Sequence, residues 1–184
     1  MSMSGWEAVL AVPVTPGFDH VRGSLEAPVS LVEYGDYECP FCGRAYPVVE
    51  QVREAAGDAL MFAYRHFPLT TVHPHALPAA EAAECADARG AFWPMHDLLF
   101  LDQQHLDVPA LVGRAAALGL DVPRFKGDLL DHAYLDRVQE HFLSGVRSGV
   151  AGTPTFFVNG IRYDGPHDVP NLLAAVEQAA HVRT

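Results

Sequence analysis

Lysine is almost absent from this sequence: of its 12 basic residues only Lys126 is a lysine, against 23 acidic residues. The formal net charge is −11 at pH 7. Such an excess of negative charge disfavours nucleic acid and anionic membrane as the main binding partners. The charge therefore argues against two classes of function and leaves the fold open.

The sequence also has little that would direct it into or across a membrane. It contains no Lys or Arg before Arg22, and Glu7, Pro13 and Pro16 interrupt its first apolar stretch. A secretory signal needs a basic start, an uninterrupted apolar run and a cleavage site. No run approaches the roughly 20 apolar residues that span a bilayer. We therefore expect a cytoplasmic protein that binds no membrane.

Cysteine is scarce, with only Cys39, Cys42 and Cys85. In a reducing compartment a close pair is more often catalytic or metal-binding than structural. A structural zinc site needs four ligands, but a second cysteine pair is missing, and His73 and His75 are closer in sequence than the histidines of a usual zinc pair. We therefore expect no metal. Cys85 lies among alanines, where a free cysteine usually acts as a small buried hydrophobic side chain.

The cysteine pair lies between a predicted strand and a predicted helix. Residues 27–36 form a mostly apolar, β-rich run that is typical of a buried central strand. Pro40 suits the first turn of a helix, because that position needs no amide hydrogen, and Gly57 is a natural stop. Cys39 is thus predicted at or just before the first turn. Residues 59–68 read as a second strand.

The remainder of the sequence changes period twice. Residues 73–150 are predicted to form several short helices, and the last of these has four apolar residues on one face: Leu135, Val138, Phe142 and Val146. Asn159-Gly160 between two β-rich runs predicts a hairpin. A final helix is expected over 167–182. This order predicts an α/β protein with a mixed sheet and helices on both sides.

We expect one domain made of three parts. Residues 20–72 would supply a βαβ unit, residues 73–150 a helical insertion, and residues 151–184 a ββα unit. No linker or internal repeat divides the chain.

Three features carry a resemblance to a known family. They are "VEYGDYECPFC" (32–42), the long helical insertion, and "GTPTFFVNG" (152–160), in which a Thr-Pro pair precedes the third strand. Together they resemble the thioredoxin fold with a helical insertion, and more closely the DsbA-like thiol:disulfide oxidoreductases. The resemblance covers roughly residues 20–180.

The resemblance implies an enzyme that exchanges disulfides with protein or low-molecular-weight thiols. It implies a redox-active Cys39–Cys42 disulfide, no further cofactor, and a redox partner that resets the site. In resembling proteins the residue before the third strand is a cis-proline that faces the cysteines. Pro154 matches that position, and Thr153 beside it, with Pro40 and Phe41, would contact the substrate.

Physical chemistry explains why a helix start suits this activity. The thiolate is the attacking species in disulfide exchange, and unpaired amides at a helix N-terminus favour it. Cys39 is expected to be the exposed nucleophile, and Cys42, one turn on, the buried resolving thiol. Asp36 and Glu38 would oppose a thiolate at Cys39. We expect both to be solvated and therefore weak in effect.

Glu33 is a candidate for proton transfer. Alternation along the strand places it on the same side as Val29 and Leu31. If that side is buried, the pKa of Glu33 rises and it could exchange a proton with Cys42. In resembling families an acid six residues before the first cysteine has this role. The alternative is a solvated glutamate at a strand end.

One alternative function remains, a redox-inactive thioredoxin-fold module that binds a peptide or a metal. The sequence leaves open the natural substrate, the redox potential, the oligomeric state, and the choice between oxidase, reductase and isomerase. His96, His105, His132 and His141 show no ligand spacing, and surface or helix-packing roles are sufficient for them.

Overall fold

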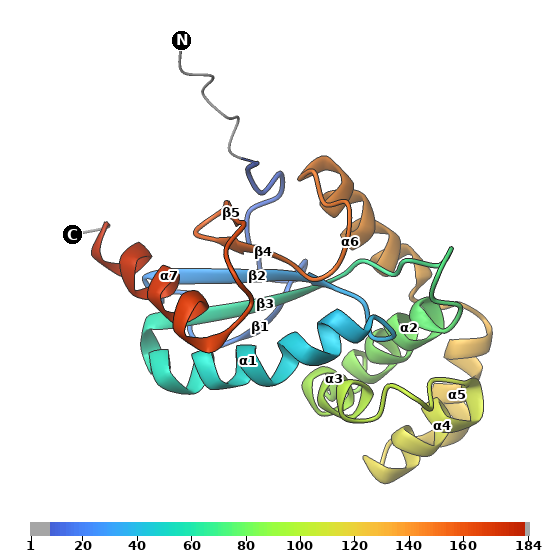
Figure 1. Cartoon of the computed structure of the whole chain (residues 1–184). Coiled ribbons are helices and arrows are strands. Elements are labelled where there is room, and N and C mark those ends of the chain that lie inside the picture. Colours follow the sequence, from blue (N-terminus) through green and yellow to red (C-terminus); the bar gives the residue numbers. More distant parts are fainter. Residues whose placement is uncertain (1–7, 183–184) are drawn as a thin grey trace.

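The computed structural model describes residues 8–182 and contains a five-stranded mixed sheet (Figure 1). The strand order is β1-β3-β2-β4-β5, in which β2 and β3 run parallel and the other neighbours are antiparallel. The strands are β1 (His20–Arg22), β2 (Val29–Gly35), β3 (Leu60–His66), β4 (Thr155–Val158) and β5 (Ile161–Tyr163). The predicted α/β class is confirmed.

Seven α-helices lie within the described residues. They are α1 (Pro40–Ala56), α2 (Ala76–Asp87), α3 (Phe92–Leu101), α4 (Val108–Ala117), α5 (Val122–Leu130), α6 (Leu135–Arg147) and α7 (Val169–His181). Helices α2 to α6 form the helical insertion between β3 and β4, as expected. None of the helices between residues 8 and 182 has both the length and the apolar character needed to cross a bilayer.

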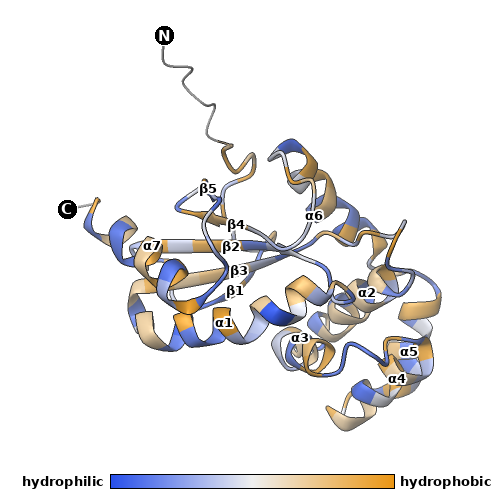
Figure 2. Ribbon diagram, viewed as in Figure 1, coloured by the Kyte–Doolittle hydropathy of each residue, from blue (hydrophilic) through white to orange (hydrophobic). Residues whose placement is uncertain are grey.

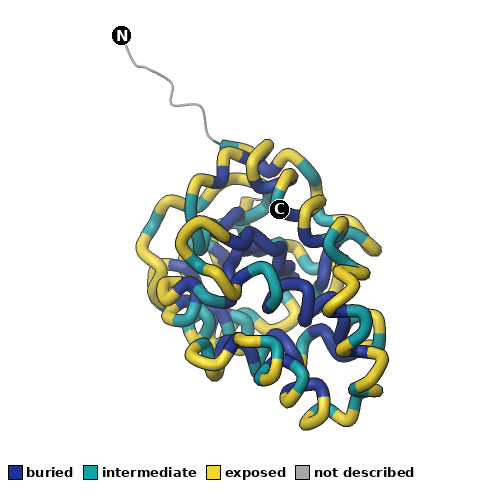
Figure 3. Tube along the Cα trace, turned by 90° about the vertical axis from the view of Figure 1, so that its right-hand side faces the viewer, coloured by how far each residue is buried: buried dark blue, intermediate teal, exposed yellow. Residues whose placement is uncertain are grey.

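The two central strands β2 and β3 are buried on both faces, and the buried parts of the chain lie at the centre of the molecule (Figure 3). Helices α1 and α7 pack against the face that carries Val29, Leu31 and Phe62. Helix α6 packs against the opposite face, where Phe142 meets a cluster that includes Tyr34. Along these amphipathic helices polar and apolar residues alternate (Figure 2).

Several local predictions are confirmed. Strands β2 and β3 begin and end within two residues of the predicted bounds. Asn159 and Gly160 connect β4 to β5 with φ of 47° and 82°, the left-handed backbone that a two-residue hairpin turn needs. The structure also shows that Asp107 and Asp121 cap α4 and α5 through their side chains.

The apolar face predicted for α6 is only partly right. Val138 is buried, but Val146 is 52% exposed. The face that packs against the sheet contains the small or polar residues His141, Ser144 and Gly145. Because a glycine at 145 leaves room for the rings of Phe67 and Tyr34, the helix approaches the sheet along a stripe that hydrophobic periodicity does not reveal.

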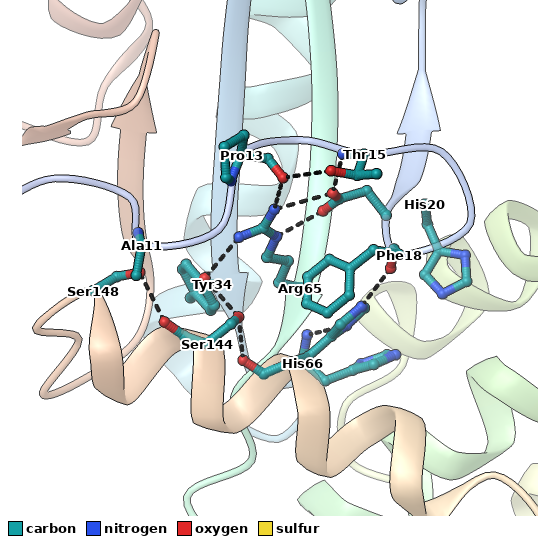
Figure 4. A network of polar contacts seen from close by, with 12 residues as sticks. Ala11, Pro13, Thr15, Phe18, His20, Tyr34, Arg65, His66, Ser144 and Ser148 are labelled. Carbon is teal, nitrogen blue, oxygen red and sulfur yellow. Dashed lines mark hydrogen bonds and ion pairs between the residues drawn. The ribbon is translucent and has the colours of Figure 1, made fainter.

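A buried ion pair ties the N-terminal segment to the sheet (Figure 4). Arg65 of β3 donates from Nε and Nη2 to the two carboxylate oxygens of Asp19, at 2.6 and 3.0 Å. Its Nη1 donates to the hydroxyl of Tyr34 at 2.9 Å, and that hydroxyl lies 2.8 Å from Ser144 Oγ on α6. One side chain thus joins three segments that are distant in sequence.

Candidate active site

Cys39 is the N-cap residue of α1 and Pro40 is its first helical residue, as predicted. The backbone of Cys39 is extended, with φ −69° and ψ 121°, and no side-chain oxygen caps this helix. The amides of Phe41 and Cys42 instead interact with the Cys39 sulfur. The sequence therefore places a thiol where a helix most favours a negative sulfur.

The loop before β4 covers the sulfur of Cys39. The Thr153–Pro154 peptide bond is cis, and Cys39 Sγ lies 3.4 Å from the carbonyl oxygen of Thr153. The Thr153 hydroxyl oxygen is buried and forms no hydrogen bond with the described residues. It is still close enough to the Cys39 sulfur to help lower the pKa of that thiol. Cys39 is only 3% exposed, so the expectation of an exposed nucleophile is wrong in this reduced form.

The two thiols differ sharply in acidity. The pKa of Cys39 is lowered to about 5, chiefly by a hydrogen bond from the Cys42 thiol, against the opposing effect of burial. Thr153 and the two amides of the first helical turn add to the lowering. The pKa of Cys42 is raised well above its usual value, first by burial and then by its hydrogen bond to Cys39. One thiol is thus ready to attack at neutral pH while the other keeps its proton.

Glu33 lies on the same sheet face as Val29 and Leu31 and is 2% exposed. Its pKa is raised to about 8, first by burial and then by the charge on Cys39. Its Oε1 has no hydrogen-bond partner among residues 8–182. The charge of Glu33 in turn raises the pKa of Cys42. A carboxyl group that titrates near neutral pH therefore lies within electrostatic reach of both thiols.

The expectation that Asp36 is solvated is wrong, because Asp36 is buried. Its carboxylate accepts hydrogen bonds from the amides of Glu38 and Leu69, at 2.8 and 2.9 Å, and lies 2.8 Å from His73 Nδ1. Its own amide donates to Cys42 Sγ at 3.5 Å. The sequence could not reveal this, because Leu69 and His73 belong to a loop more than 30 residues away.

Phe41, between the cysteines, is 60% exposed, and the guanidinium of Arg44 lies 4.4 Å from its ring centre. Sequence reasoning missed Gln103, whose amide donates to the carbonyl oxygens of Tyr37 and Cys39 at 2.8 and 2.9 Å. A side chain at Gly43 would collide with this amide. Gly43 therefore allows the helical insertion to hold the loop that carries the first cysteine.

Cys85 is buried in α2, as expected. Burial raises its pKa to about 12, the charge of Asp128 acting in the same direction. It is thus an inert thiol in this form of the protein.

A second polar cluster could in principle hold a metal. His20 Nε2 and His66 Nε2 each lie 2.7 Å from Glu84 Oε1, and all three residues are buried. These are hydrogen-bond separations, and Arg137 Nε lies 3.0 Å from the other carboxylate oxygen. We interpret the cluster as a hydrogen-bonded polar core that joins β1, β3, α2 and α6. Neither His20 nor His66 was singled out from the sequence.

Comparison with known proteins supports the assignment of the fold. The thioredoxin family model Thioredoxin_4 matches residues 15–178. Among solved structures, oxidised BdbD from Bacillus subtilis superposes with a TM-score of 0.83 at 22% identity, covering 95% of this chain and 99% of that one. A thioredoxin-like oxidoreductase from Silicibacter pomeroyi gives 0.79 at 25% identity, covering 90% and 94%.

Curated relatives with higher sequence identity are described as sodium/proton antiporters. A sodium/proton antiporter, NhaA 1 of Salinispora arenicola, is 49% identical over 170 residues, which is 92% of this chain and 26% of that protein. The NhaA 3 antiporter of Salinispora tropica is also 49% identical, over the same two shares. The chain thus spans about a quarter of the length of the curated relatives it matches. The solved structures confirm the thioredoxin fold with a helical insertion that was expected from the sequence, and the match over residues 15–178 shows that the chain belongs to the thioredoxin family.

Proposed function

We propose that the chain is a thiol:disulfide oxidoreductase that uses Cys39 and Cys42 as its dithiol/disulfide couple. The observation that carries the proposal is the placement of the Cys39 sulfur at the N-cap of α1, in contact with the Cys42 thiol and the Thr153 carbonyl oxygen. That arrangement gives two adjacent thiols opposite acidities, which is what a two-step exchange requires.

The reaction follows from these acidities. The Cys39 thiolate attacks one sulfur of a substrate disulfide, and the other substrate sulfur leaves as a thiolate. In the mixed disulfide Cys39 carries no charge, which removes one of the two charges that raise the pKa of Glu33. The ionised Glu33 carboxylate then takes the proton of Cys42, which attacks Cys39 Sγ and releases the second substrate thiolate. The substrate gains two electrons and the chain becomes the Cys39–Cys42 disulfide. The reverse sequence oxidises a dithiol, and the balance depends on the potential of the couple.

Substrate contacts belong to the surface around Cys39. The carbonyl oxygen of Thr153 lies 3.4 Å from the Cys39 sulfur, and Pro154 follows it through a cis peptide bond. Phe41, two residues after Cys39, has an exposed ring. We propose that these residues and Pro40 contact an extended peptide or a small disulfide, and that a separate redox partner resets the site. The cytoplasm as the place of action stays a prediction.

Trapping tests the proposal. In Cys42→Ser the mixed disulfide on Cys39 cannot be resolved, so adducts should accumulate there when the reduced variant meets a disulfide substrate. Cys39→Ser should form no adduct, and Cys85→Ser should react like the wild type. Equal adducts on all three cysteines would contradict the assigned roles. Peptide or metal binding that persists in Cys39→Ala, with no exchange in the wild type, would favour a redox-inactive binding module.

The antiporter relatives support a proposal about the partner. In place of the expectation that the chain has no membrane partner, we infer that it exchanges disulfides with a membrane antiporter, because a segment resembling 92% of this chain makes up about a quarter of such proteins. The remainder of the Salinispora arenicola antiporter, reconstituted in vesicles, should change its sodium–proton exchange when the chain is added oxidised rather than reduced. The Cys39→Ser, Cys42→Ser double variant should remove that difference. No difference, and no mixed disulfide with the antiporter, would overturn the partner and leave the oxidoreductase proposal standing.

A further inference from the structure

Two carboxylates immediately precede the cysteine pair, and each is held by a histidine of one loop. Asp36 Oδ2 lies 2.8 Å from His73 Nδ1, and Glu38 Oε1 lies 3.0 Å from His75 Nδ1. The amide of His75 also donates to Glu38 Oε2 at 2.6 Å. The two pairs have the same spacing in sequence, so the loop 69–75 is fastened to the segment before Cys39 at two points.

Asp36, the acid of the inner pair, contacts both cysteines through its backbone. The amide of Cys39 donates to the carbonyl oxygen of Asp36 at 3.1 Å, and the amide of Asp36 donates to Cys42 Sγ. The Asp36 side chain is wholly buried, while that of His73 is 18% exposed. A buried carboxylate is expensive unless a charge or hydrogen bonds compensate it. A protonated His73 can supply the positive charge that compensates the Asp36 carboxylate.

The groups that face His73 favour its charged form. Burial lowers its pKa, but the hydrogen bond to Asp36 and the charges of Asp36, Cys39 and Glu38 raise it, and the net effect is a raised pKa. All three of these groups are acids, and they come from the segment that ends at the start of α1. The outer pair is more accessible, since the His75 side chain is 47% exposed. Solvent screens a charge at that position.

We propose that His73, held by Asp36, is a positioning residue that places a positive charge beside the Cys39 thiolate. The inference rests on the proposed exchange function and deepens it. Pro40 and Phe41, between the cysteines, carry no charge, so the charge comes from a loop distant in sequence. Asp36 fixes the imidazole, and the imidazolium in turn offsets the carboxylate that would otherwise repel the thiolate.

Titration of the Cys39 thiolate in the reduced full chain tests this, read by ultraviolet absorbance and by the rate of alkylation with iodoacetamide. His73→Ala should raise the pKa of Cys39 by about one unit, because a nearby opposite charge typically lowers an acid's pKa by 1 to 3 units. Alkylation near the wild-type pKa should then slow by several-fold. The matched variant His75→Ala should change both readings much less.

Two replacements separate charge from packing. His73→Lys keeps a cation and should restore most of the low pKa, whereas His73→Asn keeps a hydrogen bond to Asp36 and should not. If His73→Ala leaves the Cys39 pKa unchanged, or if Asn restores it and Lys does not, the inference is wrong. Thermal unfolding of each variant identifies any that fail to fold. If His73→Ala is one of them, the Cys39 pKa in His73→Lys and His73→Asn decides between a role of charge and a role of packing.

These outcomes differ from failure of the proposed function. If the wild type contains no acidic thiol at all, the exchange mechanism itself fails. If the wild type contains one and every His73 variant shares it, only the role of His73 is lost.

Discussion

At the scale of single residues, the same buried site lowers the pKa of one acid, Cys39, and raises the pKa of two neighbours, Glu33 and Cys42. Cys39 gains direct hydrogen bonds to its sulfur, which outweigh burial, and its pKa falls. Glu33 and Cys42 gain fewer compensating contacts, so burial dominates and the pKa of each rises. The result is one charged sulfur with two neutral acids close by.

The raised pKa of Glu33 should make the free energy of unfolding depend on pH. Its folded pKa is about 8, against 4.5 for a glutamate in water, so the folded state retains a proton that the unfolded state loses. The wild type therefore loses stability relative to Glu33→Gln as pH rises from about 4.5 to about 8, by an amount on the order of a few kcal/mol, and the difference levels off above.

Denaturant unfolding of both proteins across that pH range is the measurement. A difference in free energy of unfolding that stays constant with pH would mean that Glu33 titrates normally, and its role in proton transfer would lose its basis. The same variant should also resolve mixed disulfides more slowly, since Cys42 would lack a proton acceptor.

At the scale of elements, α6 shows where sequence periodicity misleads. Its packed stripe includes Gly145, where an added Cβ would lie 2.6 Å from Phe67 Cδ2 and 3.0 Å from Tyr34 Cδ1. Both are buried aromatic rings that cannot move aside freely. Close approach of the helix, rather than a large apolar side chain, therefore fixes its position on the sheet.

Replacing Gly145 by alanine should destabilise the protein by roughly 1 to 3 kcal/mol, the usual effect of overpacking a core, although alanine is the better helix former. Gly113 of α4 is the matched control, because a Cβ there would meet nothing within 4 Å. Gly113→Ala should stabilise by up to about 1 kcal/mol. Similar free energies of unfolding for the two variants would contradict the packing described for α6.

Local sequence patterns predicted most helices and strands well, but they could not predict contacts between residues that are distant in sequence. Pro40 and Gly57 marked the two ends of the cysteine-bearing helix, and Asn159-Gly160 marked the hairpin, because each acts on its own backbone. The short strand β1 carries no such signal, since its three residues pair with β3, which is distant in sequence. The burial of Asp36 was missed for the same reason, as its partners come from another loop.

At the scale of the whole molecule, a buried charge pair fastens the N-terminal segment to the sheet. Asp19 and Arg65 have fully buried side chains and form two hydrogen bonds. Removing one partner of a buried pair leaves the other uncompensated, whereas replacing both by apolar residues is often nearly neutral.

Asp19→Ala should therefore lower the free energy of unfolding by roughly 3 to 5 kcal/mol. The double variant Asp19→Leu, Arg65→Met should be less destabilised than Asp19→Ala, because no charge is left buried. Denaturant unfolding of the two variants and the wild type checks this. A double variant at least as unstable as the single one would show that the pair is needed for more than charge compensation.

The central claim is that Cys39 is an acidic thiol made so chiefly by its neighbour Cys42, and a pH titration of the reduced chain tests it most directly. Thiolate absorbance and alkylation, mapped to each cysteine by mass spectrometry, should show Cys39 ionising near pH 5, as its pKa of about 5 predicts. Cys42 and Cys85 should stay protonated well past neutrality. Cys42→Ala should raise the pKa of Cys39 further than Cys42→Ser, because serine retains a hydroxyl donor. If all three thiols instead ionise together near the ordinary cysteine value, the account of this site is wrong.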